Sequence, residues 1–321
     1  MSRGLGDVYK RQERDNIRSG FRHLIALGDS DAVVDAVWRL LLYWWIRNLL
    51  PEAKAWMTDV LDAGARLADR TRAIALALSA WVSLLQPGPE VDLAPIEESA
   101  VLFQADGDAF SEGCALTVLC TACMYRSPPD LDRAETVQRR ALELVTADRD
   151  STFNAFFRAG LGTIELFRGH GAGALAVAED VVAQSVEIGD RLDEAVALTN
   201  AGWARLALGD ARPELFVRGL ELTLRLGFED GTGYALEGLG ACAALLGDVE
   251  RSGMLLGAAE AARTRTGMSD LRARITHLPF AQQILASEQA SQFEAARARG
   301  RAMSRTDAVS LALVQTAVEQ A

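Results

Sequence analysis

Cys120 and Cys123 form a C-x2-C pair, a spacing used by metal and redox sites, and Cys114 lies six residues before them. A structural zinc ion takes four ligands, yet the sequence offers neither a second such pair nor a nearby pair of histidines. Buried free cysteines on a helix act as small hydrophobic side chains. We therefore interpret these cysteines as core residues, with a metal or redox site as the alternative, and expect no disulfides in a cytosolic chain.

The histidines and carboxylates do not form a catalytic pattern. His23, His170 and His277 are isolated from one another, and a capping or solvated role explains them. A glycosidase needs two carboxylates that face one cleft, and nothing distinguishes pairs such as Glu97-Glu98 among the 44 acidic residues. Phosphate-loop, nucleophile-elbow, zinc-protease and dinucleotide-binding motifs are absent from the sequence. The sequence therefore predicts that the chain is not an enzyme and has no catalytic residues, no cofactor and no metal.

Composition narrows the range of partners. The formal net charge is −11, whereas surfaces that bind nucleic acid directly are basic. The most apolar stretch, residues 37–50, carries Arg39 and Arg47 and indicates a buried helix rather than a membrane span. The start of the chain has no secretory signal pattern. We expect a cytoplasmic protein with no direct nucleic-acid partner and no membrane partner.

The element that must position any site is a repeat of about forty residues. Small residues recur at this spacing, with Glu214 interrupting the series at its fifth place: Ala53, Ala94, Ala134, Ala174 and Ser252. Glycines precede the last three places by twelve residues, at Gly162, Gly202 and Gly240, and a second glycine follows each of them after seven, at Gly169, Gly209 and Gly247. A fixed period of this size is typical of a solenoid of stacked units.

Each unit is predicted to be a hairpin of two helices. The apolar residues between Val196 and Leu208 recur at helical rather than strand spacing. Gly209-Asp210 and Gly247-Asp248 are expected to end one helix and start the next, because glycine adopts the left-handed conformation and aspartate caps free amides. Most prolines fall near these predicted turns. A hairpin of this kind cannot bury its apolar face alone and must stack on its neighbours.

The pattern resembles the tetratricopeptide repeat, with small residues at its eighth and twentieth places and glycine at its fifteenth. The match is good over residues 112–265 and weak over 30–110, where Leu41 takes the place of Gly202. The resemblance implies an all-α fold, a right-handed α-solenoid over residues 13–268, closed by capping helices in residues 269–321. The period exceeds the usual 34 residues and predicts longer helices or wider loops between units, such as Glu187–Ala195.

Residues 1–12 do not fit the repeat pattern. The segment GDVYKRQ is similar to translated sequencing-adapter sequence and fits no place in the repeat. We expect residues 1–12 to be a non-native, disordered segment, with the natural protein beginning upstream of Glu13 and the chain being a fragment.

In tetratricopeptide solenoids the first helices of the units line a concave groove. The resemblance places eight residues in that groove: Cys120, Cys123, Thr163, Thr199, Asn200, Trp203, Tyr234 and Glu237. We predict a ligand or partner site at Asn200, Trp203, Tyr234 and Glu237, because an amide can pair with an extended ligand and the rings offer apolar area with a polar edge. The alternative is that Trp203 packs between units and that Asn200 caps a helix or is hydrated. We expect replacement of Asn200 and Glu237 by alanine to leave the melting temperature nearly unchanged.

Both ends of the chain resemble one protein family. Residues Glu13–Asp29 are similar to the stretch that follows the ATPase and winged-helix parts of large bacterial signal-transduction ATPases and LuxR- or MalT-like transcriptional regulators. Residues Leu255–Met268 and Phe293–Leu313 resemble the last repeat and closing helices of the same proteins. The match is carried by Asp15, Asn16, Arg18, Phe293, Gly300, Ser304, Ala308 and Val309.

This resemblance implies a sensor and protein-contact arm. Its partners would be a protein, peptide or small-molecule effector on the concave face and an ATPase domain that precedes the arm in the intact protein. In many members of the family a helix-turn-helix follows the closing helices. The alternative function is a free-standing tetratricopeptide scaffold that mediates protein assembly, and a phosphate loop with a winged helix upstream of Glu13 would separate the two.

Overall fold

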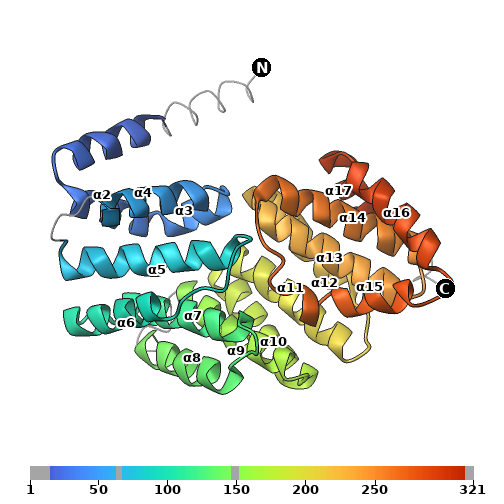
Figure 1. Cartoon of the computed structure of the whole chain (residues 1–321). Coiled ribbons are helices and arrows are strands. Elements are labelled where there is room, and N and C mark those ends of the chain that lie inside the picture. Colours follow the sequence, from blue (N-terminus) through green and yellow to red (C-terminus); the bar gives the residue numbers. More distant parts are fainter. Residues whose placement is uncertain (1–14, 63–66, 146–151, 315–321) are drawn as a thin grey trace.

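The computed structural model describes residues 15–62, 67–145 and 152–314, and every regular element in these ranges is a helix. The predicted all-α fold is confirmed (Figure 1). The segment 1–12 that the sequence marks as foreign lies outside the described residues. Within the described part of the chain, no helix is both long enough and apolar enough to cross a membrane.

The helices follow one another with short connections. A helix over residues 15–26 precedes the elements labelled in Figure 1. These are α2 (Ser30–Arg39), α3 (Leu41–Ile46), α4 (Leu50–Asp62), α5 (Asp69–Leu85), α6 (Ala94–Asp106), α7 (Ala109–Tyr125), α8 (Leu131–Val145), α9 (Thr152–Phe167), α10 (Gly171–Ile188), α11 (Arg191–Ala207), α12 (Pro213–Leu226), α13 (Glu229–Leu245) and α14 (Val249–Thr266). A short 3-10 helix, η1 (Ala273–Ile275), leads into α15 (Leu278–Leu285), α16 (Ala290–Ala302) and α17 (Arg305–Leu313).

The described residues between Ser30 and Thr266 form six stacked hairpins, as predicted. In each unit from α5–α6 to α13–α14 the first helix packs against the second. The first helices α5, α7, α9, α11 and α13 also pack against one another in that order. The helix pair α2–α3, broken at Leu40, takes the place of a first helix at the start of the stack and packs with α4 and α5. Figure 1 shows the units stacking in the order of the sequence.

The in-phase glycines have two distinct roles. Gly169, Gly209 and Gly247 adopt φ of 76°, 75° and 83° at the ends of their helices, which confirms the predicted left-handed turns. Asp248 caps α14, since its carboxylate accepts from the Arg251 amide at 3.0 Å. Asp210 does not cap a helix: α12 begins at Pro213, and the Asp210 carboxylate instead accepts from the Arg205 and Arg212 guanidinium groups.

Two of the upstream glycines, Gly202 and Gly240, allow the two helices of their hairpins to approach closely, whereas a Cβ atom on Gly162 would lie at an ordinary 3.5 Å from Val177. A Cβ atom on Gly202 would lie 2.5 Å from the Phe216 ring, and one on Gly240 would lie 2.8 Å from Leu256. Real Cβ contacts are not that short, so larger residues would push the second helix away. In the units α11–α12 and α13–α14 the glycine of the repeat therefore lies where the two helices are in close contact.

Longer helices account for the extended period. The helices α10, α11, α13 and α14 have 18, 17, 17 and 18 residues. Only Gly189 and Asp190 separate α10 from α11. The alternative of a wide inter-unit loop over Glu187–Ala195 is therefore wrong, and the extra residues of that repeat are helical.

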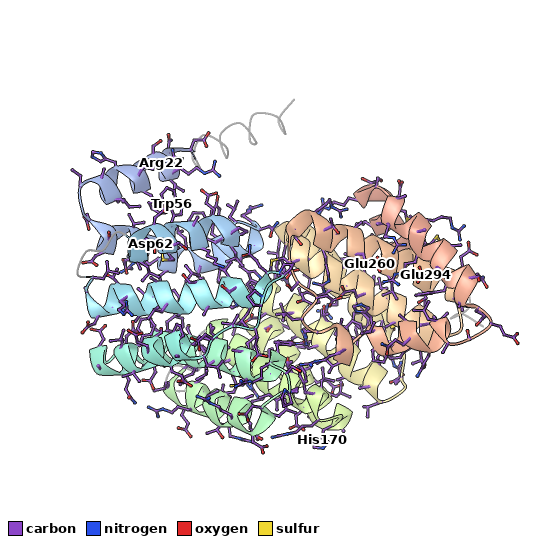
Figure 2. All side chains as sticks on the ribbon, viewed as in Figure 1. Arg22, Trp56, Asp62, His170, Glu260 and Glu294 are labelled. Carbon is purple, nitrogen blue, oxygen red and sulfur yellow. The ribbon has the colours of Figure 1, made fainter. Side chains whose placement is uncertain are left out.

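The closing helices cover the end of the stack. α16 packs closely along α14, where a Cβ on Gly257 would lie 2.0 Å from the Arg297 carbonyl oxygen. Glu260 on α14 accepts hydrogen bonds from Arg297 and Arg301 of α16. Figure 2 shows Glu260 and Glu294 on neighbouring helices, and the Arg297 side chain also pairs with Glu294 at 3.1 Å. The residues predicted to cap the solenoid thus include α16, which packs against the last unit and is held there by ion pairs.

Candidate functional site

The stack curls until its early and late units touch. The rings of Trp45 on α3 and Phe228 before α13 meet edge to face with centroids 5.0 Å apart. Met268 is buried in the core cluster of the first units, and the next amide, that of Ser269, donates to the Leu85 carbonyl at 2.7 Å. The segment between α14 and α15, orange in Figure 1, therefore runs back across the concave face.

A cavity of about 190 Å³ lies between this segment and the first helices. Its walls combine aromatic rings with threonine side chains and a few stronger polar groups, among them Trp45, Trp81, Thr121, Tyr125, Thr163, Thr199, Asn200, Asp230, Tyr234, Leu271 and Arg272. The Thr163 and Thr199 hydroxyls donate to carbonyls of their own helices, so their oxygens remain able to accept. The cavity thus offers apolar area with a small set of hydrogen-bonding groups, the usual composition of a small-molecule site.

A second cavity of about 60 Å³ adjoins the first, because Trp45, Trp81, Thr117 and Thr121 line both. Its remaining walls come from α2, α3, α5, α7 and the first turn of α11 and include Trp38, Leu41, Leu78, Cys114 and Asp193. Asp193 is the one charged residue in this lining. The two spaces form one internal site along the concave side of the stack.

The chain itself closes this site. The Arg272 guanidinium donates to the Asn200 side-chain oxygen at 2.8 Å, and Arg274 donates to the Met124 carbonyl at 3.0 Å. Arg272 also lies over the Tyr234 ring at 5.9 Å from its centroid. A charged hydrogen bond and a cation–π contact of this kind hold a segment in place without a continuous helix.

Of the four residues predicted as a site, the structure places two in the cavity lining, Asn200 and Tyr234. Trp203 is 2 % exposed and packs edge to face against Phe216, with ring centroids 5.2 Å apart. Glu237 is also buried and lies outside the lining. Trp203 follows Asn200 by three positions on α11, and Glu237 follows Tyr234 by three positions on α13. Each therefore lies on the same face of its helix as the lining residue, about one turn beyond the cavity.

Glu237 belongs to a buried ion cluster. Its carboxylate accepts from Nε and Nη2 of Arg263, the latter at 2.7 Å, and His277 Nε2 lies 3.3 Å from an Asp270 oxygen. Burial works against the charge of Arg263, but Glu237 raises the pKa of this guanidinium well above its ordinary value. The cluster joins α13 and α14 to the segment that closes the cavity.

Glu237, Asp270 and His277 are close enough to share a metal ion. Both oxygens of Glu237 are already engaged by Arg263, so a cation would compete with a guanidinium for them. The arrangement fits an ion cluster that fixes the closing segment, which is the role we assign to it.

The other sequence candidates divide between cavity and core. Thr163 and Thr199 line the cavity, as predicted for first-helix positions. Cys120 and Cys123 lie in a core cluster with Ile96 and Met124, and all four cysteines of the chain are buried. Burial raises the pKa of the Cys120 thiol. The core interpretation is confirmed for Cys120 and Cys123, whereas Cys114 is buried and also lines the smaller cavity.

The remaining polar candidates lie apart from the cavity. His170 is at the outer edge of the molecule in Figure 2, with Nδ1 3.2 Å from a Glu165 oxygen. Glu97 pairs with Arg133, and Glu98 pairs with Arg72. The two carboxylates therefore have separate arginine partners and do not share a cleft.

Burial sets the charge of the acidic groups at the cavity. Burial, with a smaller effect from the charge of Asp190, raises the pKa of Asp193 to about 7. Burial also raises the pKa of Asp230 to about 6, although Arg263 acts in the opposite direction. Both carboxyls thus change charge near neutral pH.

Sequence reasoning missed Trp38, Trp45, Trp81, Asp193 and Arg272 as cavity residues. The tryptophans fall in the region where the repeat pattern is weak, and Asp193 falls in the stretch considered for a wide loop. A signal was present in the clustering of tryptophan within residues 38–81, since an indole on a first helix has to face either a core or the concave side. The sequence gives no sign that Arg272 lines the cavity, because its position depends on how far the stack curls.

Comparison with known protein families and with curated proteins gives no match to this chain.

Proposed function

We propose that this chain is the non-catalytic sensor arm of a bacterial transcriptional regulator or signalling ATPase. In this proposal the arm works in the cytoplasm and takes up an effector in the cavity of its concave face. The proposal is supported by the resemblance of both ends of the chain to such regulators and by the repeat architecture, which presents one continuous concave surface.

The observation that carries the proposal is the cavity itself. Well-packed interiors leave few spaces larger than a water molecule, whereas about 190 Å³ remains open here between aromatic and polar side chains. Its lid is a segment with one short 3-10 helix, η1, and it is held by a few polar contacts, including those of Arg272 and Arg274. A binder that occupies the cavity would alter these contacts, and the lid leads directly into α15 and the closing helices.

A neutral fluorescent probe tests the cavity as a binding site. N-phenyl-1-naphthylamine brightens in apolar surroundings, and we expect the folded chain to bind it with saturable enhancement. Thr121 lines both cavities, so Thr121→Trp should fill the space and abolish the enhancement. Thr136→Trp adds the same bulk at an exposed position and should leave it unchanged. No enhancement, or equal enhancement in both variants, would overturn the proposed site.

The intact gene tests the wider assignment. The proposal predicts a phosphate loop followed by a winged helix in the sequence upstream of Glu13. An upstream sequence that encodes neither would favour a free-standing scaffold, with the concave face serving protein assembly.

A further inference from the structure

Two adjacent acidic residues at the start of α11 have opposite surroundings. Glu194 is buried and pairs with Arg191 at 2.6 Å and with Arg218. Burial would raise the pKa of Glu194, but these arginine partners lower it. Asp193 is 8 % exposed, and within the described residues it has no ion pair. Its Oδ2 atom also has no hydrogen-bond partner.

A buried carboxylate without a partner is unusual, because removing a charge from water is costly unless a counter-charge or hydrogen bonds replace the lost solvent. Asp193 contributes to the lining of the smaller cavity. A cation in that space would supply the counter-charge that the ionised Asp193 carboxylate lacks. Of the titratable side chains around it, Asp190 on the same helix is acidic, and Cys114 on α7 stays a thiol because burial raises its pKa.

The other walls of the smaller cavity suit a positive charge. Trp38, Trp45 and Trp81 all line the smaller cavity, and the Trp45 and Trp81 rings meet at 68° with centroids 5.9 Å apart. The face of an indole ring attracts cations, and this attraction strengthens where water is excluded. Indole rings also provide apolar area for methyl or methylene groups.

We propose that the joined cavities bind a small organic cation, an ammonium group with apolar substituents, with its charge between the tryptophan rings and the Asp193 carboxylate. The inference rests on the proposed function and deepens it by naming the chemical class of the effector. The larger cavity, with Thr121, Thr163 and Asn200 in its lining, receives the rest of the molecule.

Other ligand classes fit these walls less well. In the smaller cavity an anion would lie against the Asp193 carboxylate and the Asp190 charge next to it, and in the larger cavity the Arg272 guanidinium already donates to Asn200. A divalent metal ion needs several oxygen ligands, and the smaller cavity supplies one carboxylate among mostly apolar side chains. A neutral apolar molecule would leave Asp193 without a partner.

Choline and its neutral isostere 3,3-dimethylbutan-1-ol provide a matched pair of probes. Calorimetric titration at pH 8 keeps Asp193 ionised, since its pKa is about 7. We expect choline to bind at least about tenfold more tightly than the isostere, because the two differ in charge and hardly in shape. Asp193→Asn should lower the affinity for choline by about tenfold or more and leave the affinity for the isostere unchanged. Asp59→Asn makes the same charge change at an exposed position and should have no effect.

Three outcomes would overturn this inference. They are equal binding of choline and the isostere, choline binding that Asp193→Asn does not change, and no choline binding up to about 10 mM, an affinity weaker than a specific site provides. The fluorescent neutral probe separates the two proposals. If that probe binds and choline does not, the cavity remains the site and its ligand is not a cation. If neither binds, both proposals fail.

Discussion

The Arg272 guanidinium donates a hydrogen bond to the side-chain oxygen of Asn200 at 2.8 Å, although 72 residues separate them in the chain. Asn200 is the residue that the repeat pattern marks for contact with a ligand. In the structure its oxygen is occupied by the segment that crosses the concave face. A ligand in the cavity would therefore either share Asn200 with Arg272 or displace it.

Removing Arg272 should loosen the closing segment. Arg272→Ala deletes the hydrogen bond to Asn200 and the contact with the Tyr234 ring, a loss of about 1.5–3 kcal/mol for a charged hydrogen bond. We expect faster hydrogen exchange at the Ser269 amide, which donates to Leu85, with little change in the amides of α7. Arg265→Ala, at an exposed position of α14, is the control. Unchanged exchange at Ser269 would show that the segment is held by other contacts.

Glu237→Ala should destabilise the fold strongly. The sequence led us to expect a nearly silent substitution, but Glu237 is buried and accepts two hydrogen bonds from Arg263. Loss of Glu237 leaves the buried Arg263 guanidinium with longer ion contacts, to Asp270 at 3.6 Å and to Asp230 at 3.9 Å, and breaking such a buried pair costs about 3–5 kcal/mol. Urea unfolding should show this loss, whereas Glu214→Ala, at an exposed position of α12, should cost less than about 1 kcal/mol. Equal stability of the two variants would contradict the buried cluster.

The charge of Asp193 should make stability depend on pH. Its pKa is about 7 in the folded chain and about 3.9 in an unfolded chain. Between these values the folded state holds a proton that the unfolded state releases, so stability falls as pH rises through this window. From pH 5 to pH 8 the loss is about 2–3 kcal/mol.

Asp193→Asn removes this contribution. The variant should gain stability relative to the natural chain at pH 8, and the gain should shrink towards pH 5. The pKa of Asp230 is also raised in the folded chain. Both proteins contain Asp230, so the difference between their stabilities reports on Asp193. Unfolding curves that shift in parallel at every pH would show that Asp193 does not titrate near neutrality.

The closing helix should not tolerate a methyl group at its contact with α14. Gly257→Ala places a Cβ 2.0 Å from the Arg297 carbonyl oxygen, and the forced separation should cost about 1–3 kcal/mol. Gly233→Ala, with its nearest neighbour at 3.9 Å, should instead be neutral or stabilising by up to about 1 kcal/mol. Calorimetric melting of the two variants checks whether their changes in stability have opposite signs. A stabilised Gly257→Ala variant would contradict the close approach of α14 and α16.

The sequence predicted the parts of the fold that depend on neighbouring residues. Helices and the turns at Gly209 and Gly247 follow from periodicity and backbone conformation. The face of each first helix that turns inward was also predicted, since Asn200 and Tyr234 line the cavity. The position along the helix was not predicted, because Trp203 and Glu237 lie one turn further on, where Phe216 and the Arg263 cluster cover them.

The return of the closing segment could not be predicted from repeat spacing. It depends on the curl that brings Trp45 against Phe228 and Met268 against the first units, and small rotations between units add up over the whole stack. Arg272 and Asp193 gain their roles only from that closure.

Anomalous diffraction from a crystal grown with 1-bromonaphthalene tests the central claim most directly, since bromine marks where a neutral apolar ligand binds. We expect a bromine peak inside the concave cavity, between Trp45, Trp81 and Tyr234, and no such peak in the Thr121→Trp variant. Bromine found only on the outer surface, with the cavity collapsed around its own side chains, would contradict the assignment of this cavity as the effector site.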